Sequence, residues 1–488
     1  MWYGVSSIAA RFINYLLTPY LTLELSKADY GKMGLIYAAI PLLNVIFTYG
    51  METAYFRFAQ RNEAESSIYS TASLSIILTT IFFGFLLWTF QGALARFAGV
   101  TDYPLLIQLS IIIIFFDTLT TLPFARLRHQ GRPIKFAFIR IFGILINIAA
   151  TIFFISYCPK IYAHNPNSWI AYFYSPETNP VVYILLANVI QSIITFLLLI
   201  GELGAVRLKF STRLWKEMMI YSLPLIIVGM GGMVNEVFDR LMLRWWLPGS
   251  VTHVEEQVGV YNACYKLSIL ITLFIQAFRM GAEPFFFKQS QGKNPQATYA
   301  RVMKFFVITI SLMFLLVTLF LPIWRHFINA KFWAGLNIVP TLLLANMFLG
   351  IYYNLSIWYK LSNKTLAGAY ITIIGAAITF LINGIFIPHY SYVASAWATF
   401  TCYGSMMVIS YIWGQKYYRI PYASKKLVAY MVIAVILFFI HKGITTLITN
   451  TYFSLVFAAV LMFAYTSFIL FIEKKEFQKL PVVGKYIR

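Results

Sequence analysis

Charged residues are scarce in this sequence, and acidic residues are the scarcest. Only 11% of the 488 residues are charged, with 17 aspartates and glutamates against 38 lysines and arginines, whereas 60% are hydrophobic. A soluble protein of this length carries about twice that share of charge. The composition therefore excludes an ordinary soluble protein and predicts an all-α integral membrane protein.

Cysteine is also rare, and the residue clusters of common metal and catalytic centres are missing from the sequence. The three cysteines, Cys158, Cys264 and Cys402, lie in or at the end of apolar runs, and the six histidines are scattered. The sequence holds no Gly-rich phosphate loop, nucleophile elbow or paired-carboxylate signature. We therefore expect no disulfides, metal site, cofactor or catalytic residues, and a protein that is not an enzyme.

The net charge is +21, and most of the basic residues that produce it lie in loops. A nucleic-acid-binding protein can carry such a charge, but here the lysines and arginines lie in short loops between apolar runs, so we expect no nucleic-acid partner. Basic residues gather on the cytoplasmic side of membrane proteins. The loops on one side hold most of them, which predicts that both termini are cytoplasmic.

Apolar runs long enough to cross a bilayer follow one another along the chain. A span needs about 20 apolar residues. The run from Trp2 to Leu23 lacks a basic leader and a small-residue cleavage site, so we expect a span and not a cleaved signal. The fourteen expected spans are 2–23, 34–56, 71–95, 104–125, 134–157, 180–201, 217–239, 258–285, 302–323, 336–358, 366–387, 392–413, 425–442 and 451–472.

One short motif occurs twice. Gly50–Arg57 (GMETAYFR) and Gly281–Lys288 (GAEPFFFK) share Gly-x-Glu-x-x-[Tyr/Phe]-Phe-[Arg/Lys], and we expect each to close a span. Tyr69 and Tyr299 recur at nearly the same spacing. Spans 1–6 therefore look duplicated as spans 7–12, in a parallel pseudo-twofold repeat of two six-helix lobes. The expected parts are 1–206, 207–415, and 416–488 with spans 13 and 14 and a basic tail.

Several charged residues fall inside the expected spans, where a charge costs about 3 kcal/mol by insertion scales. Arg11 lies near the middle of span 1 without an acidic residue within one helical turn. Such a guanidinium indicates a wet cavity or an anionic ligand that its fork can bind. The structural alternative is an ion pair with Glu52 on another helix.

Three further candidates lie in span 8. Arg279 and Glu283 are four residues apart on one helix face, so Arg279 either pairs with Glu283 or contacts a ligand. Lys266 points elsewhere on the helix, because thirteen residues separate it from Arg279. It is either a ligand contact or a side chain that extends to the interface.

The remaining charges admit structural roles. Asp117 is a mid-span acid that either pairs with Arg140 or carries a coupling proton. Arg57 ends its span, where it either anchors the topology or captures an anion. The cluster of Glu236, Asp239 and Arg240 fits a structural latch. Together the spans carry a basic surplus, which suits an anionic substrate with an apolar part.

These residues resemble a known family. The stretches Arg11–Pro19 (RFINYLLTP), Ala28–Gly31 (ADYG), Tyr49–Phe58 (YGMETAYFRF), Asp239-Arg240 and Phe278–Phe287 (FRMGAEPFFF) are similar to those of bacterial polysaccharide-biosynthesis flippases of the Wzx type. This family belongs to the multidrug/oligosaccharidyl-lipid/polysaccharide exporter superfamily. The resemblance covers spans 1–12, and its motifs are typical of the family and not of one substrate.

The resemblance implies two six-helix lobes around a central cavity, alternating access, and a location in the bacterial inner membrane. It implies that the protein flips an undecaprenyl-pyrophosphate-linked oligosaccharide, with membrane lipid and a polysaccharide polymerase as further partners. Arg11, Arg57, Lys266 and Arg279 are the substrate-binding residues that it implies. Glu52, Asp117 and Glu283 are then structural or coupling residues.

Three alternatives remain open at this point. A cation-coupled multidrug exporter of the same superfamily needs an acid-centred cavity, and Asp117 is the acid available for it. A lipid II flippase shares the fourteen-span layout. A scaffold for glycan assembly has no reason to carry mid-membrane charges.

Overall fold

The protein is described by a computed structural model that covers residues 2–59, 65–290, 292, 294–362, 364–448 and 450–478, with the backbone alone at 2–7, 283 and 284. Helices and turns make up these residues, and no strand occurs among them. They form two compact units, of which unit 1 comprises 1–263 and 369–402, and unit 2 comprises 264–368 and 403–488. The expected division at 206 and 415 stays a prediction.

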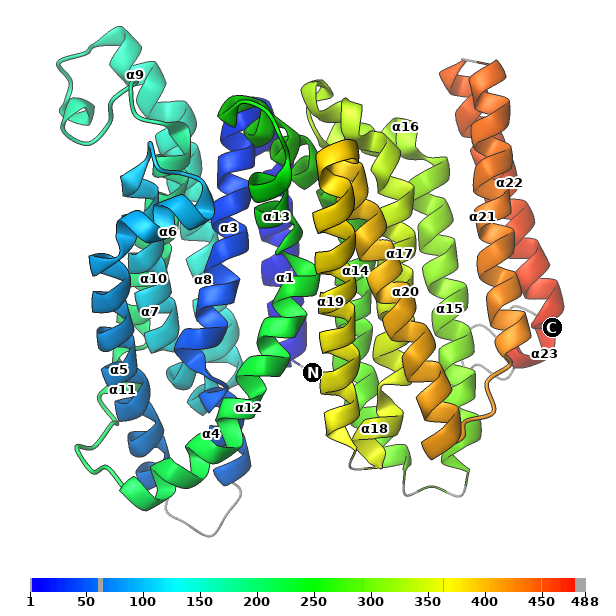
Figure 1. Ribbon diagram of the computed structural model, residues 1–488, viewed down its shortest axis with the longest axis horizontal. Helices are drawn as coiled ribbons and strands as arrows, with labels where there is room; N and C mark the ends of the chain where they lie inside the picture. The colour runs from blue at the N-terminus through cyan, green and yellow to red at the C-terminus, as the bar shows by residue number, and fades with distance from the viewer. Residues whose placement is uncertain are drawn as a thin grey trace. The chain divides into compact units, whose positions relative to one another are not determined.

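Unit 1 contains the helices of the first half of the chain (blue to green in Figure 1). It also contains parts of three helices that continue into unit 2: α14 (Val251–Gln289), α19 (Thr365–Tyr390) and α20 (Tyr392–Tyr417). Its other elements are α1 (Trp2–Tyr15), α2 (Leu17–Glu24), α3 (Lys27–Thr48), α4 (Met51–Phe58), α5 (Glu65–Thr89), α6 (Gln91–Ala98), α7 (Pro104–His129), α8 (Pro133–Ile152), η1 (Phe153–Tyr157), α9 (Cys158–His164), η2 (Trp169–Tyr172), α10 (Pro180–Leu198), α11 (Ile200–Leu203), α12 (Thr212–Glu236) and α13 (Asp239–Trp246).

Unit 2 continues from α14 to the last described helix. Within it α21 and α22 lie side by side, and both pack against α15 (Figure 1). The elements are α15 (Pro295–Leu319), α16 (Leu321–Trp324), η3 (Arg325–Phe327), η4 (Ala330–Ile338), α17 (Val339–Leu355), α18 (Ile357–Leu361), α21 (Ser424–Leu447), α22 (Thr451–Ile472) and α23 (Lys474–Phe477).

The expectation of an all-α membrane protein is confirmed. Twelve helices of the described chain are long and apolar enough to cross a membrane. The expected first span is divided into α1 and α2, each shorter than a span. The expected twelfth span is α20, a single 26-residue helix that is rich in Tyr, Ser, Thr and Gly and therefore less apolar.

Helix starts follow local chemistry. Ser26 accepts a hydrogen bond from the backbone N–H of Asp29, and Asn450 accepts from those of Tyr452 and Phe453. These side chains satisfy N–H groups that the first turn of a helix leaves without partners. Proline occupies the first turn of α7, α8, α10 and α15, where its missing N–H costs nothing.

The second span ends earlier than the sequence predicts. Tyr49 and Gly50 adopt left-handed backbone angles, with φ of 34° and 71°, and the chain breaks between α3 and α4. A Cβ at Gly50 would lie 3.0 Å from the Leu225 Cβ, so glycine suits both the backbone and the space. The expected span 34–56 was therefore wrong at both ends, and the first motif begins a short helix instead of closing a long one.

The two motifs share a packing role. Tyr55, in the first motif, packs edge-on against Tyr69 with ring centroids 5.9 Å apart. In unit 2 the corresponding residues, Phe286 and Tyr299, pack edge-on at 5.2 Å. All four side chains are buried, and such ring pairs add about 0.5–1.5 kcal/mol beyond the area they bury. The repeated sequence therefore encodes the same contact between successive helices in each half.

A buried carboxylate fastens the last two spans to the rest of unit 2. Glu473, at the end of α22, is 3% exposed. It accepts hydrogen bonds from Lys304 of α15 at 2.7 Å and from Tyr430 of α21 at 2.6 Å, and Lys426 lies 3.3 Å away. One acidic side chain thus joins three helices.

The surroundings of Glu473 set its pKa. Burial acts to raise the pKa of this carboxyl, but the hydrogen bonds from Lys304 and Tyr430 and the charges of Lys304 and Lys426 outweigh burial, so the pKa lies below the ordinary value of 4.5. A depressed pKa means that the ionised form stabilises the fold. This stabilisation is fully present above pH 4.5 and is lost as the pH falls through the lowered pKa.

We predict that Glu473→Gln lowers the free energy of unfolding by about 2 kcal/mol at pH 7, because hydrogen bonds to a charged group are lost. The thermal unfolding midpoint of the purified protein in detergent measures this effect. The gap between wild type and variant should narrow as the pH is lowered below 4.5.

Glu217→Gln is the matched control, because it removes an ion pair whose arginine, Arg213, has a side chain that is 91% exposed. It should change the midpoint little. An equal loss in both variants, or a gap that is independent of pH, would contradict the role of Glu473.

Candidate functional site

A cluster of arginines lies within unit 1. Arg140 of α8 is close enough to Arg11 of α1 and Arg128 of α7 for each charge to act on its guanidinium. Arg11 and Arg140 keep an accessible surface, and the Arg140 guanidinium stacks on Phe124 at 4.3 Å from the ring centroid. Helix α1 packs on α8, which brings Arg11 into this group. Three cations from three helices therefore share one region of the unit.

Two acidic residues accompany these arginines. Glu52 of α4 forms an ion pair with Arg128, an arginine that the sequence analysis did not single out. Asp117 of α7 accepts a hydrogen bond from the Ser192 hydroxyl at 2.7 Å, and its charge acts on Arg140. We expected Asp117 either to pair with Arg140 or to carry a coupling proton, and both roles stay predictions.

A third acidic residue, which was not predicted from the sequence, organises the neighbouring basic loop. Glu202 of α11 is 4% exposed and lies within 3.3 Å of Arg126, 2.9 Å of Arg132 and 2.9 Å of Lys135. The Tyr69 hydroxyl donates to its backbone carbonyl at 3.0 Å. An acid directly after an apolar run, on the side where basic residues gather, was the available signal.

Arg57 occupies a different position. Its side chain is exposed at the end of α4, and its guanidinium stacks on Tyr221 of α12 at 4.2 Å from the ring centroid. Tyr221 also packs against Phe58. This stacking holds the cation in place while its surface remains accessible.

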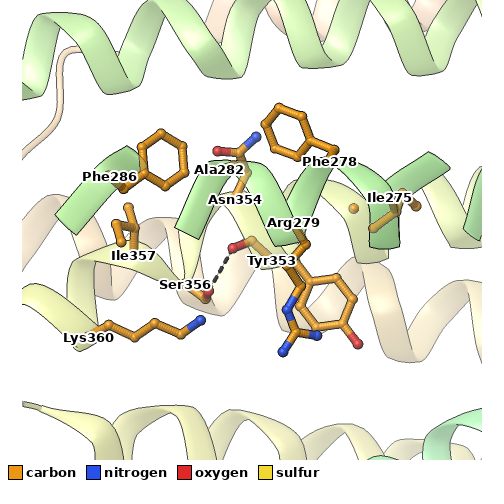
Figure 2. A pocket seen from close by; sticks show the side chains of 11 residues that line it. Ile275, Phe278, Arg279, Ala282, Phe286, Tyr353, Asn354, Ser356, Ile357 and Lys360 are labelled. Carbon is orange, nitrogen blue, oxygen red and sulfur yellow. Dashed lines mark hydrogen bonds between the residues drawn. The ribbon is translucent and has the colours of Figure 1, made fainter. Parts of the chain in front are cut away.

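Unit 2 contains a pocket with two basic residues. Arg279 of α14 and Lys360 of α18 line it, and Arg279 stacks on the Tyr353 ring at 4.6 Å (Figure 2). Asn354, 4% exposed, also lines it, and its amide nitrogen makes no hydrogen bond. The residues named for this pocket include no carboxylate. The pocket therefore presents donors and positive charge to a ligand.

Lys266 and Glu283 are the other two candidates from the expected eighth span. Lys266 is half-buried on α14 and is not among the residues that line the pocket. The side chain of Glu283 lies outside what the structure describes, so its pairing with Arg279 stays a prediction. Within the described residues, no group of three or more His, Cys, Asp or Glu side chains is placed to hold a metal ion.

Two helices of unit 1 cross in very close contact. Helix α3 meets the start of α14 so closely that a Cβ at Gly31 would lie 1.9 Å from the Glu255 carbonyl oxygen, and one at Gly259 would lie 2.1 Å from that of Lys27. The Lys32 ammonium bridges the crossing, 3.3 Å from Asp29 and 3.6 Å from Glu255.

A buried ion pair lies close to this crossing in the chain. Arg240 of α13 lies 2.8 Å from Asp239, and its guanidinium also donates to Asn262 of α14 at 3.3 Å. The Tyr261 hydroxyl donates to the other Asp239 oxygen. The contacts join α13 to α14, as the structural latch expected for Asp239 and Arg240 would.

Comparison with known proteins gives a family and a fold. The family described as polysaccharide biosynthesis protein matches residues 1–290. A Haemophilus influenzae protein described as an uncharacterized membrane protein is 20% identical over 355 residues, which is 70% of this chain and 78% of that protein.

Two solved structures share the fold. The lipid II flippase MurJ in an inward closed conformation superposes with a TM-score of 0.67 at 13% identity, over 96% of this chain and 98% of that one. An inward-facing multidrug resistance MATE family transporter of the MOP superfamily gives 0.63 at 13% identity, over 83% and 94%. The two-lobe fold expected from the sequence is thus confirmed.

We predict that Gly31→Ala loosens the crossing of α3 and α14, because the added methyl group meets a backbone carbonyl that cannot rotate away. The free energy of unfolding should fall by about 2–3 kcal/mol, as for other overpacked sites. Thermal unfolding in detergent measures it. Gly92→Ala, in α6, is the control, since a Cβ there meets nothing within 4 Å. Equal unfolding midpoints for Gly31→Ala and wild type would contradict the close contact of α3 with α14 at Gly31.

Proposed function

We propose that this chain, which belongs to the polysaccharide biosynthesis protein family, is a flippase for an undecaprenyl-pyrophosphate-linked oligosaccharide. It moves the lipid-linked sugar from the inner to the outer leaflet of the bacterial inner membrane by alternating access. Both termini lie in the cytoplasm, because the loops on that side hold most of the lysines and arginines. The product serves surface polysaccharide synthesis.

The arginine cluster of unit 1 carries this proposal. The charges of Arg11 and Arg128 both act on Arg140, and the acidic residues near Arg140 are Glu52 and Asp117. Charges among membrane helices are costly, and a cluster of arginines there suits an anionic ligand. A pyrophosphate is doubly anionic and offers oxygens in the geometry that guanidinium forks bind.

The substrate-binding residues follow from accessibility. Arg11 and Arg57 in unit 1 and Arg279 in unit 2 are exposed cations, and the last two are held by stacking on Tyr221 and Tyr353. Lys266 completes the set that the family resemblance implies. To these we add Arg140 beside Arg11, and Lys360 beside Arg279.

The closed crossing of α3 and α14 fits the proposed cycle. Alternating access needs one end of the molecule shut while the other is open. In the proposed cycle the Gly31–Gly259 contact and the Lys32 bridge shut one end of unit 1. Release of the product at that end requires these contacts to separate.

A multidrug exporter coupled to a cation is less well supported. Such a protein needs an acidic residue that a cation can reach. Asp117 accepts a hydrogen bond from Ser192 and lies close enough to Arg140 for the two charges to act on each other. The carboxylate is therefore engaged in the resting structure.

We predict that Arg140→Ala and Arg11→Ala each reduce export of surface polysaccharide by about 10- to 100-fold, as expected when a hydrogen bond to a charged group is removed. Surface polysaccharide on cells that depend on this gene measures it, with membrane levels of each variant determined in parallel. Arg140→Lys should recover part of the activity, because the charge is kept and the fork is lost.

Arg213→Ala is the control for loss of a basic residue, since this side chain is 91% exposed. Normal export in both the Arg140→Ala and the Arg11→Ala variant would overturn the proposal. Flipping of labelled lipid-linked oligosaccharide by the purified protein in vesicles, with lipid II in a parallel sample, separates the proposed substrate from the related one. Preference for lipid II would assign the protein to that reaction.

A further inference from the structure

A second pocket lies in unit 2, far along the bundle from Glu473. It has a volume of about 400 Å³ and is formed where α15 ends, α21 ends and α22 begins, with η3 and η4 at its rim. Lys442, which lines the pocket, follows Lys426 by 442 − 426 = 16 residues on α21, so the pocket lies about 24 Å along that helix from Lys426. It is therefore at the opposite end of the membrane-spanning helices from the Glu473 junction.

The pocket combines positive charge with an apolar wall. Arg325 of η3 and Lys442 of α21 line it, and the residues that form it include no aspartate or glutamate. Leu321, Phe438 and Ile448 provide apolar surface. A site for a free sugar or a metal ion would need neither this charge nor this surface, whereas a lipid phosphate with its adjoining acyl chain matches both.

Arg325 is held in position before any ligand arrives. Its guanidinium stacks on the Trp333 ring at 4.4 Å from the centroid, and the Trp333 indole N–H donates to the Arg325 carbonyl at 2.9 Å. Its Nε atom is buried and makes no hydrogen bond. A buried donor without a partner is costly, and an acceptor oxygen in the pocket would remove that cost.

Helices α21 and α22, which form part of the pocket, also expose large apolar side chains on their other faces. On α21, Ile436, Phe439 and Ile440 are exposed large side chains, and on α22 so are Val456 and Val460. Both helices are candidate membrane spans, so these side chains face acyl chains in a bilayer. A lipid whose phosphate sits at Arg325 and Lys442 meets Leu321, Phe438 and Ile448 of the pocket wall with the start of its chains.

Topology alone does not explain this pair of cations. Under the proposed orientation this end faces away from the cytoplasm, where the positive-inside rule disfavours lysine and arginine. Two basic residues around one pocket at that end need another reason.

We propose that this pocket binds the phosphate of an anionic membrane lipid, at the headgroup level of the outer leaflet. The leaflet rests on the proposed topology, and the site itself does not. The lipid lies against α15, α21 and α22 and bridges the two C-terminal spans to the rest of unit 2.

The test uses the full-length protein with phosphatidylglycerol, phosphatidylcholine or inorganic phosphate added to the delipidated sample in detergent. We expect phosphatidylglycerol to be retained in native mass spectra and to raise the unfolding midpoint. Phosphatidylcholine and inorganic phosphate should do neither. Lys442→Gln should weaken phosphatidylglycerol binding about fivefold, as expected for one basic residue at an anionic surface.

Arg325→Gln would remove the other cation but also its stacking on Trp333, which can destabilise the fold. Lys442 is exposed, so Lys442→Gln leaves the packing intact and is the variant used for the test. Arg96→Gln, an exposed cation on α6, is the control and should bind like wild type. Equal binding by Lys442→Gln and wild type, or equal stabilisation by inorganic phosphate, would overturn the lipid site. Because the readout is lipid binding and not export, its failure is separate from failure of the flippase proposal.

Discussion

The cost of holding charge inside a membrane-spanning bundle governs this structure. The chain has 17 acidic residues and 38 basic ones. A buried carboxylate can therefore contact more than one basic side chain. Glu202 forms ion pairs with Arg126, Arg132 and Lys135. Glu473 forms ion pairs with Lys304 and Lys426. Each acid fixes helix ends or loops that apolar packing leaves loose, because lipid is as apolar as a leucine side chain.

Basic residues also gather within each unit. In unit 1 Arg140 lies near two further arginines, Arg11 and Arg128, and near the acids Glu52 and Asp117. In unit 2 Arg279 and Lys360 line a pocket with the unbonded amide of Asn354. Aromatic rings also position arginines, because Arg57 in unit 1 stacks on Tyr221 and Arg279 in unit 2 stacks on Tyr353. A ring that holds an arginine in this way does not remove its charge.

The family match over residues 1–290 confirms the resemblance seen in the Arg11–Pro19 and Tyr49–Phe58 stretches. The sequence predicted most spans closely, and the last, 451–472, agrees with α22 to the residue. The repeated motif also had a physical meaning, since Tyr55 and Phe286 make the same ring contact in each half. The glutamate of the first motif has a different partner from the one expected. Glu52 pairs with Arg128 and not with Arg11.

Composition and run length by themselves determined the membrane class, the order of the spans, the internal repeat and the charges that lie within helices. The partners of those charges were decided by tertiary structure alone. Three features depend on how the helices rotate and meet. They are the left-handed turn at Tyr49 and Gly50, the ion pairs of Glu202 and the pocket at Arg325. In water an apolar stripe reveals the buried face of a helix. In a bilayer both faces are apolar, so the local sequence does not show which side chains meet.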